Sequence, residues 1–224
     1  MIHDDIIKNL KNFHCQDSWK FCKNFANIRN DTYGLGLVND KIDYFIDIGS
    51  CLGEVAYTAY QLLRPNKIIA IEPAHNTFEC LKKNIGHLPN TFLENKAIYH
   101  SSGTLLNLIL NPHNIGENLV INTQTEEYPV VESISFDDIL IKYSINHVKD
   151  SFFIKVDCEG SEVFILNNPK LFYCQQLSIE IHERRKEVKN LCDIWYDKIL
   201  DTHRIIKGAR HVGKNYEIIF QKKS

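Results

Sequence analysis

The amino-acid sequence predicts an α/β fold whose mostly parallel sheet ends in an antiparallel hairpin. Three observations predict it. Apolar, β-branched runs alternate with segments whose apolar residues recur at helical spacing, which is typical of successive β-α units. Carboxylates stand at the ends of several of these runs, where open α/β sheets bind their ligands. Two final apolar runs, 202–207 and 216–221, are joined by a glycine-containing loop and indicate the closing hairpin.

Composition indicates one domain with a small additional segment. The chain has 224 residues, 44% hydrophobic and 24% charged, with a net charge of −2, which is enough to bury a full core. Charges of both signs are interspersed, so we do not expect a nucleic-acid partner. No apolar run approaches the roughly 20 residues that span a bilayer, and the N-terminus lacks a signal-peptide pattern. We therefore expect a cytoplasmic protein without a membrane span, of unknown oligomeric state.

The seven cysteines are scattered and contain no Cys-x-x-Cys pair. An odd number without close pairs favours neither a disulfide framework nor a zinc cluster. We expect reduced thiols.

Residues 1–40 are predicted to form an N-terminal helical segment, with the main domain at 41–224. The apolar residues of its first 30 positions are spaced three and four apart: Ile6, Leu10, Phe13, Trp19, Cys22 and Phe25. The segment is interpreted either as a helical flap packed on the core or as a lid over a substrate. The turn-rich stretch 30–36 then leads to the first strand and is a candidate wall of the pocket.

The first strand leads into a loop marked by two glycines. Phe45, Ile46 and Ile48 flank Asp47, and a helix with Val55, Ala59, Leu62 and Leu63 on one face follows Gly49 and Gly53. Glycine lets a backbone turn sharply close to a ligand, and the following helix directs its free N–H groups there. Cys51 stands where a dinucleotide-binding loop has its middle glycine, so the loop alone is weak evidence.

A second carboxylate strengthens this interpretation. Glu72 ends the apolar run Lys67-Ile-Ile-Ala-Ile-Glu72, the position at which a nucleotide-binding β-α-β unit places the acid for ribose hydroxyls. The loop and Glu72 are independent signals of one nucleoside site.

The rest of the chain continues the alternation. Asn76 is the expected cap of a helix that ends at Gly86, and residues 91–99 are expected to form a third strand that runs into a loop. Residues 105–110 and 119–121 suggest an inserted hairpin, residues 130–134 a short extended piece, and Ser135 a cap with Asp138. Strands follow at 152–157 and 177–182, separated by a helix through Val163, Leu166 and Leu171, and a further helix carries Leu191 to Ile199.

Several segments resemble the FkbM-type methyltransferases, a class I, Rossmann-like family with a seven-stranded sheet. They are Phe45-Ile-Asp-Ile-Gly-Ser-Cys-Leu-Gly53, Ile71-Glu-Pro73, Asn95-x-Ala97 with Gly103, Ser135-Phe-Asp-Asp-Ile-Leu140, and Ile154-Lys-Val-Asp-Cys-Glu-Gly-Ser-Glu162. The last is the most specific. The resemblance covers about residues 44–183 and leaves 1–40 uncovered, and Ser50 replaces the usual alanine.

The resemblance implies S-adenosylmethionine as cofactor and S-adenosylhomocysteine as product. It places Gly49, Ser50, Cys51, Leu52 and Gly53 against the methionine part, and it assigns Asp47 to ordering this loop or to the ammonium group. Glu72, followed by Pro73, would hold the ribose hydroxyls, Asn95 and Ala97 would border the adenine, and Asp157 would lie near the cofactor.

The expected reaction is methyl transfer to a hydroxyl of a small molecule or sugar, which needs a base for the hydroxyl proton. The candidates are Asp157 and His182, then Glu159 and Glu180, because all lie at or near strand ends and Glu180 and His182 share a strand face. His182 is alternatively a structural histidine. A divalent ion on Asp157 with Glu180 or His182 is conceivable but not favoured, since the spacing is no metal motif.

Two other functions stay open at this point. A nicotinamide-dependent oxidoreductase would share the loop and Glu72, but the chain lacks the middle glycine and a Tyr-x-x-x-Lys pair. An inactive nucleotide-fold module could act through its N-terminal helices. The sequence does not identify the acceptor: a sugar hydroxyl, a polyketide-like or lipid hydroxyl, and an unusual nitrogen acceptor all fit.

Overall fold

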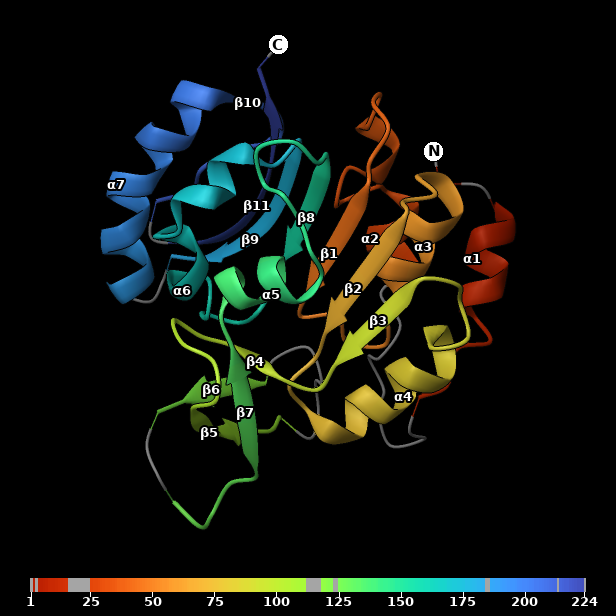
Figure 1. The fold of residues 1–224 in the computed structure, drawn as a ribbon, viewed down its shortest axis with the longest axis vertical. Helices are drawn as coiled ribbons and strands as arrows, with labels where there is room; N and C mark the ends of the chain where they lie inside the picture. The colour runs from red at the N-terminus through yellow and green to blue at the C-terminus, as the bar shows by residue number, and fades with distance from the viewer. Residues whose placement is uncertain are drawn as a thin grey trace.

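A seven-stranded sheet organises the chain in this computed structural model, which describes residues 2, 4–15, 25–111, 118–122, 125–183, 186–212 and 214–223 (Figure 1). Its strands, in spatial order, are β10 (His203–Gly208), β11 (Asn215–Lys222), β9 (Gln176–His182), β8 (Phe152–Val156), β1 (Tyr44–Ile48), β2 (Lys67–Ile71) and β3 (Thr91–Glu94). The strands from β9 to β3 run parallel, whereas β11 is antiparallel to both β9 and β10. The expected fold class is confirmed.

The order of strands places a crevice beside β1. The chain runs from β1 outward through β2 to β3, and then returns to the other side of β1 with β8. Ligands of open α/β sheets bind beyond the carboxyl ends of the strands at such a reversal. A ligand site is therefore expected at the carboxyl ends of β1, β2 and β8.

Helices cover both faces of this sheet (Figure 1). One layer contains α1 (Asp4–Leu10), α2 (Phe25–Arg29), η1 (Leu35–Leu37), α3 (Glu54–Leu62) and α4 (His75–Ile85), and the other contains α5 (Phe136–Lys142), α6 (Val163–Leu166), η2 (Pro169–Tyr173) and α7 (Lys186–Thr202). Alternation along the strands builds both cores: Phe45 packs in the first layer and Ile46 in the second. Strands buried on both faces explain why the parallel runs are continuously apolar.

A second, four-stranded sheet lies beyond the carboxyl ends of the main strands. Its order is β4 (Ala97–Ile98), β7 (Val130–Ile134), β5 (Leu105–Ile109) and β6 (Leu119–Ile121). The antiparallel pairing of β5 with β6 confirms the inserted hairpin. The expected third strand is confirmed as β3, which ends at Glu94. The expected loop after it is wrong in part, because Ala97 and Ile98 form β4 and pair with β7 in the other sheet. Between β3 and β4, the Asn95 side-chain amide donates to the Glu72 and Pro73 carbonyls.

Helix ends follow the sequence signals in part. Ser135 caps α5 as expected, accepting from the Asp138 N–H at 3.1 Å. The expectation that Asn76 caps α4 is wrong, because the helix begins at His75 and the Glu72 carboxylate, at the end of the preceding strand, accepts the Ala74 N–H.

Leu171 was expected in the same helix as Val163, but α6 ends at Leu166. Pro169 cannot continue a helix and instead begins η2, where Leu171 lies.

The N-terminal helices belong to the main core. Ile6, Leu10 and Ile28 are buried with residues of α3 and β1, whereas Phe13 follows α1 rather than lying in it. Trp19 and Cys22 lie outside the described residues. Cys15 is disulfide-bonded, which corrects the expectation that all cysteines are reduced, and the other cysteines in the described ranges are free. No helix in the described part of the chain has the length and apolarity needed to cross a membrane.

Candidate functional site

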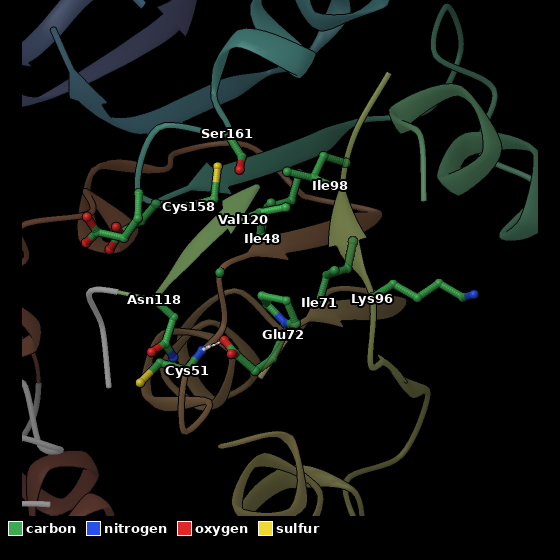
Figure 2. Close-up of a pocket in the computed structure, with 14 residues that line it drawn as sticks. Ile48, Cys51, Ile71, Glu72, Lys96, Ile98, Asn118, Val120, Cys158 and Ser161 are labelled. Atoms are coloured by element: carbon green, nitrogen blue, oxygen red, sulfur yellow. Dashed lines mark hydrogen bonds between the residues drawn. The ribbon is translucent and has the colours of Figure 1, made fainter. Parts of the chain in front are cut away.

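A pocket opens at the carboxyl ends of β1, β2 and β8 (Figure 2). The main sheet lines it with Ile48, Gly49 and Cys51 at the end of β1, Ile71, Glu72 and Pro73 at the end of β2, and Asp157, Cys158, Glu159 and Ser161 after β8. The second sheet and its flanks add Lys96, Ile98, Asn118 and Val120. The pocket therefore lies at the reversal in strand order and is closed on one side by the inserted sheet.

The turn after β1 is held by its backbone. Gly49 and Ser50 both donate their N–H groups to the Ile71 carbonyl, at 3.0 and 2.9 Å. Gly49 has φ +77°, and a Cβ there would lie 1.7 Å from the Asp157 carbonyl oxygen. Ser50 is buried, donating from Oγ to the Asp47 carbonyl and accepting from the Ile71 N–H. These contacts tie the turn to β2 and require glycine at position 49.

The second half of the turn packs away from the pocket. Gly53 has φ +90°, and a Cβ there would lie 2.7 Å from Leu81 of α4. Leu52 is fully buried against Cys80. Cys51 lines the pocket, and burial raises the pKa of its thiol well above the ordinary value, so the thiol is neutral. Of the predicted loop residues, Gly49 and Cys51 line the pocket, and the others shape the turn.

The Glu72 carboxylate is buried at the end of β2 and faces the pocket (Figure 2). Its Oε2 accepts from the Cys51 N–H and its Oε1 from the Ala74 N–H, both at 3.0 Å. Burial raises the pKa of Glu72 to about 7, although these backbone hydrogen bonds and Lys155 oppose the shift. Glu72 is thus fixed in place and poised to change its ionisation near neutral pH.

A buried lysine joins the ends of β1 and β8. The Lys155 Nζ donates to the Gly49 carbonyl at 2.6 Å and lies 3.3 Å from Asp47 Oδ1 and 3.7 Å from Asp157 Oδ2. Burial raises the pKa of Asp47 despite the opposing charge of Lys155. Asp47 is fully buried and does not line the pocket, whereas Asp157 does, and the Asp157 carboxylate accepts from the Tyr33 hydroxyl at 3.4 Å.

His182 lies among three carboxylates rather than at an open position. Its Nδ1 is 2.7 Å from Glu162 Oε1, and its Nε2 is 3.1 Å from Glu159 Oε2 and 3.7 Å from Glu180 Oε1. Burial acts to lower the pKa of His182, but hydrogen bonds to Glu159 and Glu162 outweigh it and raise the pKa to about 10. The ring is therefore protonated at neutral pH.

Glu180, at the same strand end, has a pKa raised to about 8 by burial and then by the neighbouring Asp157 charge. Of the four candidate catalytic residues, Asp157 and Glu159 line the pocket, and the structure connects His182 and Glu180 to them through the carboxylate cluster. No group of three or more His, Cys, Asp or Glu side chains is arranged to hold a metal ion within the described ranges.

The segment 95–98 lines the pocket with different residues from those predicted. Asn95 binds the Glu72 and Pro73 carbonyls, and Ala97 is fully buried in the core of the second sheet. Their neighbours Lys96 and Ile98 line the pocket, with the Lys96 ammonium turned away toward Glu132 at 2.6 Å (Figure 2).

Sequence reasoning missed Lys155 and the residues of the inserted sheet. The signal for Lys155 was a lysine within an apolar strand, since a buried ammonium requires charged partners. Asn118 and Val120 gave no such signal, because their place in the pocket depends on how the second sheet packs.

Comparison with known proteins agrees with this geometry. The profile of the methyltransferase FkbM domain matches residues 47–210. A precorrin-6y C5,15-methyltransferase from Geobacter metallireducens has a similar structure, with a TM-score of 0.50 and 11% identity over 96% of this chain and 95% of that one. A protein assigned as a methyltransferase from Streptococcus mutans, solved with S-adenosylhomocysteine, also has a TM-score of 0.50, with 10% identity over 88% and 97%.

At these identities the structural likeness shows the fold alone, and no sequence among the curated proteins matches the chain. The domain profile, in contrast, covers well over half of the 224 residues. The chain therefore belongs to the FkbM family of S-adenosylmethionine-dependent methyltransferases.

Proposed function

We propose that this protein transfers the methyl group of S-adenosylmethionine to a hydroxyl oxygen of a small molecule or sugar. The observation that carries the proposal is a single pocket with the buried Glu72 carboxylate at one strand end and the partly exposed Asp157 carboxylate at another. The family supports the methyl transfer, and it replaces the nicotinamide-dependent alternative. The acceptor atom and class are inferred from the chemistry of the pocket.

The pocket lining fits the nucleoside part of the cofactor. Each Glu72 oxygen accepts one backbone N–H, and a carboxylate oxygen has two lone pairs, so each keeps capacity for a ribose hydroxyl. The side chains of Ile71, Ile98 and Val120 offer an apolar surface for the adenine ring. In this assignment Asn95 and Ala97 act indirectly, by placing Lys96 and Ile98.

The methionine part is assigned to the Gly49 turn. Gly49 and Cys51 line this side of the pocket, while Ser50, Leu52 and Gly53 hold the turn from behind. Asp47 acts through Lys155 rather than by direct contact, since its carboxylate is fully buried. Pro73, which follows Glu72, lines the pocket on the proposed ribose side.

Bound S-adenosylmethionine supplies an electrophilic methyl group, and the protein has to orient the acceptor and remove its proton. Asp157 is the proposed base, because this residue lines the pocket and 21% of its side chain is accessible. A base within hydrogen-bond reach of the acceptor hydroxyl contributes typically 10²- to 10⁴-fold. Proton removal matters for a hydroxyl, which is a weak nucleophile when neutral.

His182 is better suited to positioning than to proton removal. A ring with a pKa of about 10 is already protonated at neutral pH and has no free lone pair. Its Nε2 holds Glu159, which lines the pocket and has φ +54°, a strained value for a residue other than glycine. We assign His182 to fixing this turn, with Glu159 and Glu180 as further acidic groups near the acceptor.

The N-terminal segment is proposed as a fixed wall of the acceptor side rather than a detachable lid. Phe13 and Cys15 pack against the cluster of Leu52 and Cys80, and the Tyr33 hydroxyl reaches Asp157. Leu10 is fully buried in the main core. Deletion of the segment would therefore disturb folding, and Tyr33→Phe is the cleaner test of its role at the site.

The acceptor class is tested with S-adenosylmethionine carrying a ¹³C-labelled methyl group, incubated separately with pools of sugars, hydroxylated small molecules, nucleic acid and protein. The proposal predicts a labelled product by mass spectrometry whose methyl carbon has the ¹³C shift of an ether. A methyl group on nitrogen or carbon would contradict the oxygen assignment, and labelled nucleic acid or protein as the sole product would contradict the small acceptor.

A further inference from the structure

Lys155 is a lysine in the interior of β8, a strand in which all five residues are buried. Only 3% of its side chain is exposed, and it does not line the pocket. An ammonium buried this deeply costs several kcal/mol of solvation unless charged and polar partners surround it. Apolar packing alone therefore does not account for a lysine at this position of the strand.

The partners of Lys155 come from both sides of the pocket. Gly49, in the turn after β1, accepts from its Nζ at 2.6 Å, and Asp47 of the same strand lies 3.3 Å away. Asp157, which follows β8, lies 3.7 Å away on the other side, and the Tyr33 ring covers the ammonium at 5.5 Å. Burial acts to lower the pKa of Lys155, but the two carboxylates outweigh it and raise the pKa, so the group stays charged.

The contacts of Lys155 are made to the end of β1, the Gly49 turn, Tyr33 and Asp157, and Lys155 acts on Glu72 only through its charge, which acts to lower the Glu72 pKa. Gly49 and Asp157 line the pocket and contact Lys155 directly, whereas Glu72, on the proposed ribose side, is held by the N–H groups of Cys51 and Ala74. A carbonyl oxygen has two lone pairs, so Gly49 can accept from Lys155 and from a ligand ammonium group at once. Lys155 thus holds the carbonyl of Gly49, a residue that lines the pocket, although Lys155 itself does not line the pocket.

We propose that Lys155 is a positioning residue for the amino-acid end of the cofactor, holding the Gly49 carbonyl on the pocket wall from behind and keeping the Asp157 carboxylate directed to the site of methyl transfer. The inference rests on the proposed cofactor site. It predicts that Lys155 discriminates between ligands that have the amino-acid part and ligands that lack it.

Two probes separate these ends. S-adenosylhomocysteine carries the amino-acid part, whereas 5′-methylthioadenosine keeps the nucleoside and sulfur without it. Lys155→Met removes the charge with little change in length. We expect calorimetry to show a loss of about 10-fold or more in the affinity for S-adenosylhomocysteine, with the affinity for methylthioadenosine kept within about threefold.

A variant with both charges removed covers the case in which an unpaired Asp47 prevents folding. The double variant Asp47→Asn with Lys155→Met leaves no lone buried charge in that pair and is expected to show the same selective loss. The matched control is Asp137→Asn with Lys170→Met, which removes an aspartate–lysine pair 2.7 Å apart between α5 and η2. This control should bind both probes as the parent does.

The outcomes are distinguishable. An equal loss of affinity for both probes, or an unchanged ratio of the two affinities in whichever Lys155 variant folds, would overturn the role of Lys155. If the parent protein itself binds neither probe, the proposed cofactor site fails first. A double variant that also fails to fold, while the control folds, would show that Lys155 acts in the fold and not in cofactor selection, and would likewise overturn the inference.

Discussion

The two walls of the pocket are built in different ways. The wall formed by the Gly49 turn and Glu72 depends on backbone groups: two N–H groups bind the Ile71 carbonyl, and two more bind the Glu72 carboxylate. The wall formed after β8 depends on charged side chains, with Lys155 and His182 each placed between carboxylates. The first wall is fixed by backbone hydrogen bonds, and the second by charged side chains, which the proposed function places at the site of methyl transfer.

The backbone wall should be the more sensitive to a single added carbon. Gly49→Ala places a Cβ 1.7 Å from the Asp157 carbonyl at φ +77°, so the ends of β1 and β8 must separate. We expect loss of cooperative thermal unfolding or of soluble protein. Gly103→Ala is the matched control, because Gly103 has φ +78° but no atom within 4 Å of the added Cβ. It should cost only about 1–2 kcal/mol of left-handed strain. Equal effects of the two substitutions would contradict the close approach at Gly49.

The charged wall should respond in turnover rather than in folding. Asp157→Asn keeps the size of the side chain and removes the proposed base. We therefore expect turnover of the acceptor found with labelled S-adenosylmethionine to fall by about 10²- to 10⁴-fold, with little change in cofactor affinity. Asp137→Asn, on α5, removes an aspartate that is outside the pocket and should leave turnover unchanged. A loss below about threefold for Asp157→Asn, an arbitrary tolerance well under the loss expected of a base, would leave acceptor positioning as the better account.

Substitution of Glu72 should affect the affinity for the cofactor more than the rate of methyl transfer. Glu72→Ala removes charge-assisted hydrogen bonds to the ribose worth about 1.5–3 kcal/mol, or roughly 10- to 150-fold in the dissociation constant of S-adenosylhomocysteine. Glu94→Gln is the control for a buried carboxylate at a strand end, since Glu94 ends β3 and accepts from the Tyr143 hydroxyl away from the pocket. An unchanged dissociation constant for Glu72→Ala would remove Glu72 from the cofactor site.

The last expected effect concerns the protonation of His182 in the charged wall. Its pKa of about 10 in the folded protein exceeds the ordinary 6.5, so its stabilisation is complete below about pH 6.5 and is lost as pH rises through 10. The slope contributed by this one proton is at most about 1.4 kcal/mol per pH unit. An NMR titration of the imidazole, assigned with His182→Gln, should show the protonated ring at pH 8. A midpoint near 6.5 would restore His182 as a candidate base.

The contrast between the walls also explains what could be predicted from the sequence. Glycine spacing and Glu72 are local signals, so the Gly49 turn, the sheet and its closing hairpin followed from pattern and resemblance. The charged wall depends on contacts between residues distant in sequence: Lys155 bonds the Gly49 carbonyl of the other wall, 106 positions away. Residues 95–98 alternate in direction, so that Lys96 and Ile98 line the pocket while Asn95 and Ala97 do not. This alternation depends on where β3 ends and β4 begins, which the sequence did not show.

The central claim is that this pocket binds S-adenosylmethionine and its product, and calorimetry tests it most directly. Purified protein is titrated with S-adenosylhomocysteine and, separately, with NAD, at pH 8 so that Glu72, with a pKa of about 7, is largely ionised. The account predicts binding of S-adenosylhomocysteine near one equivalent, weakened in Glu72→Ala, and no heat of binding for NAD. Binding of NAD with none of S-adenosylhomocysteine would contradict it.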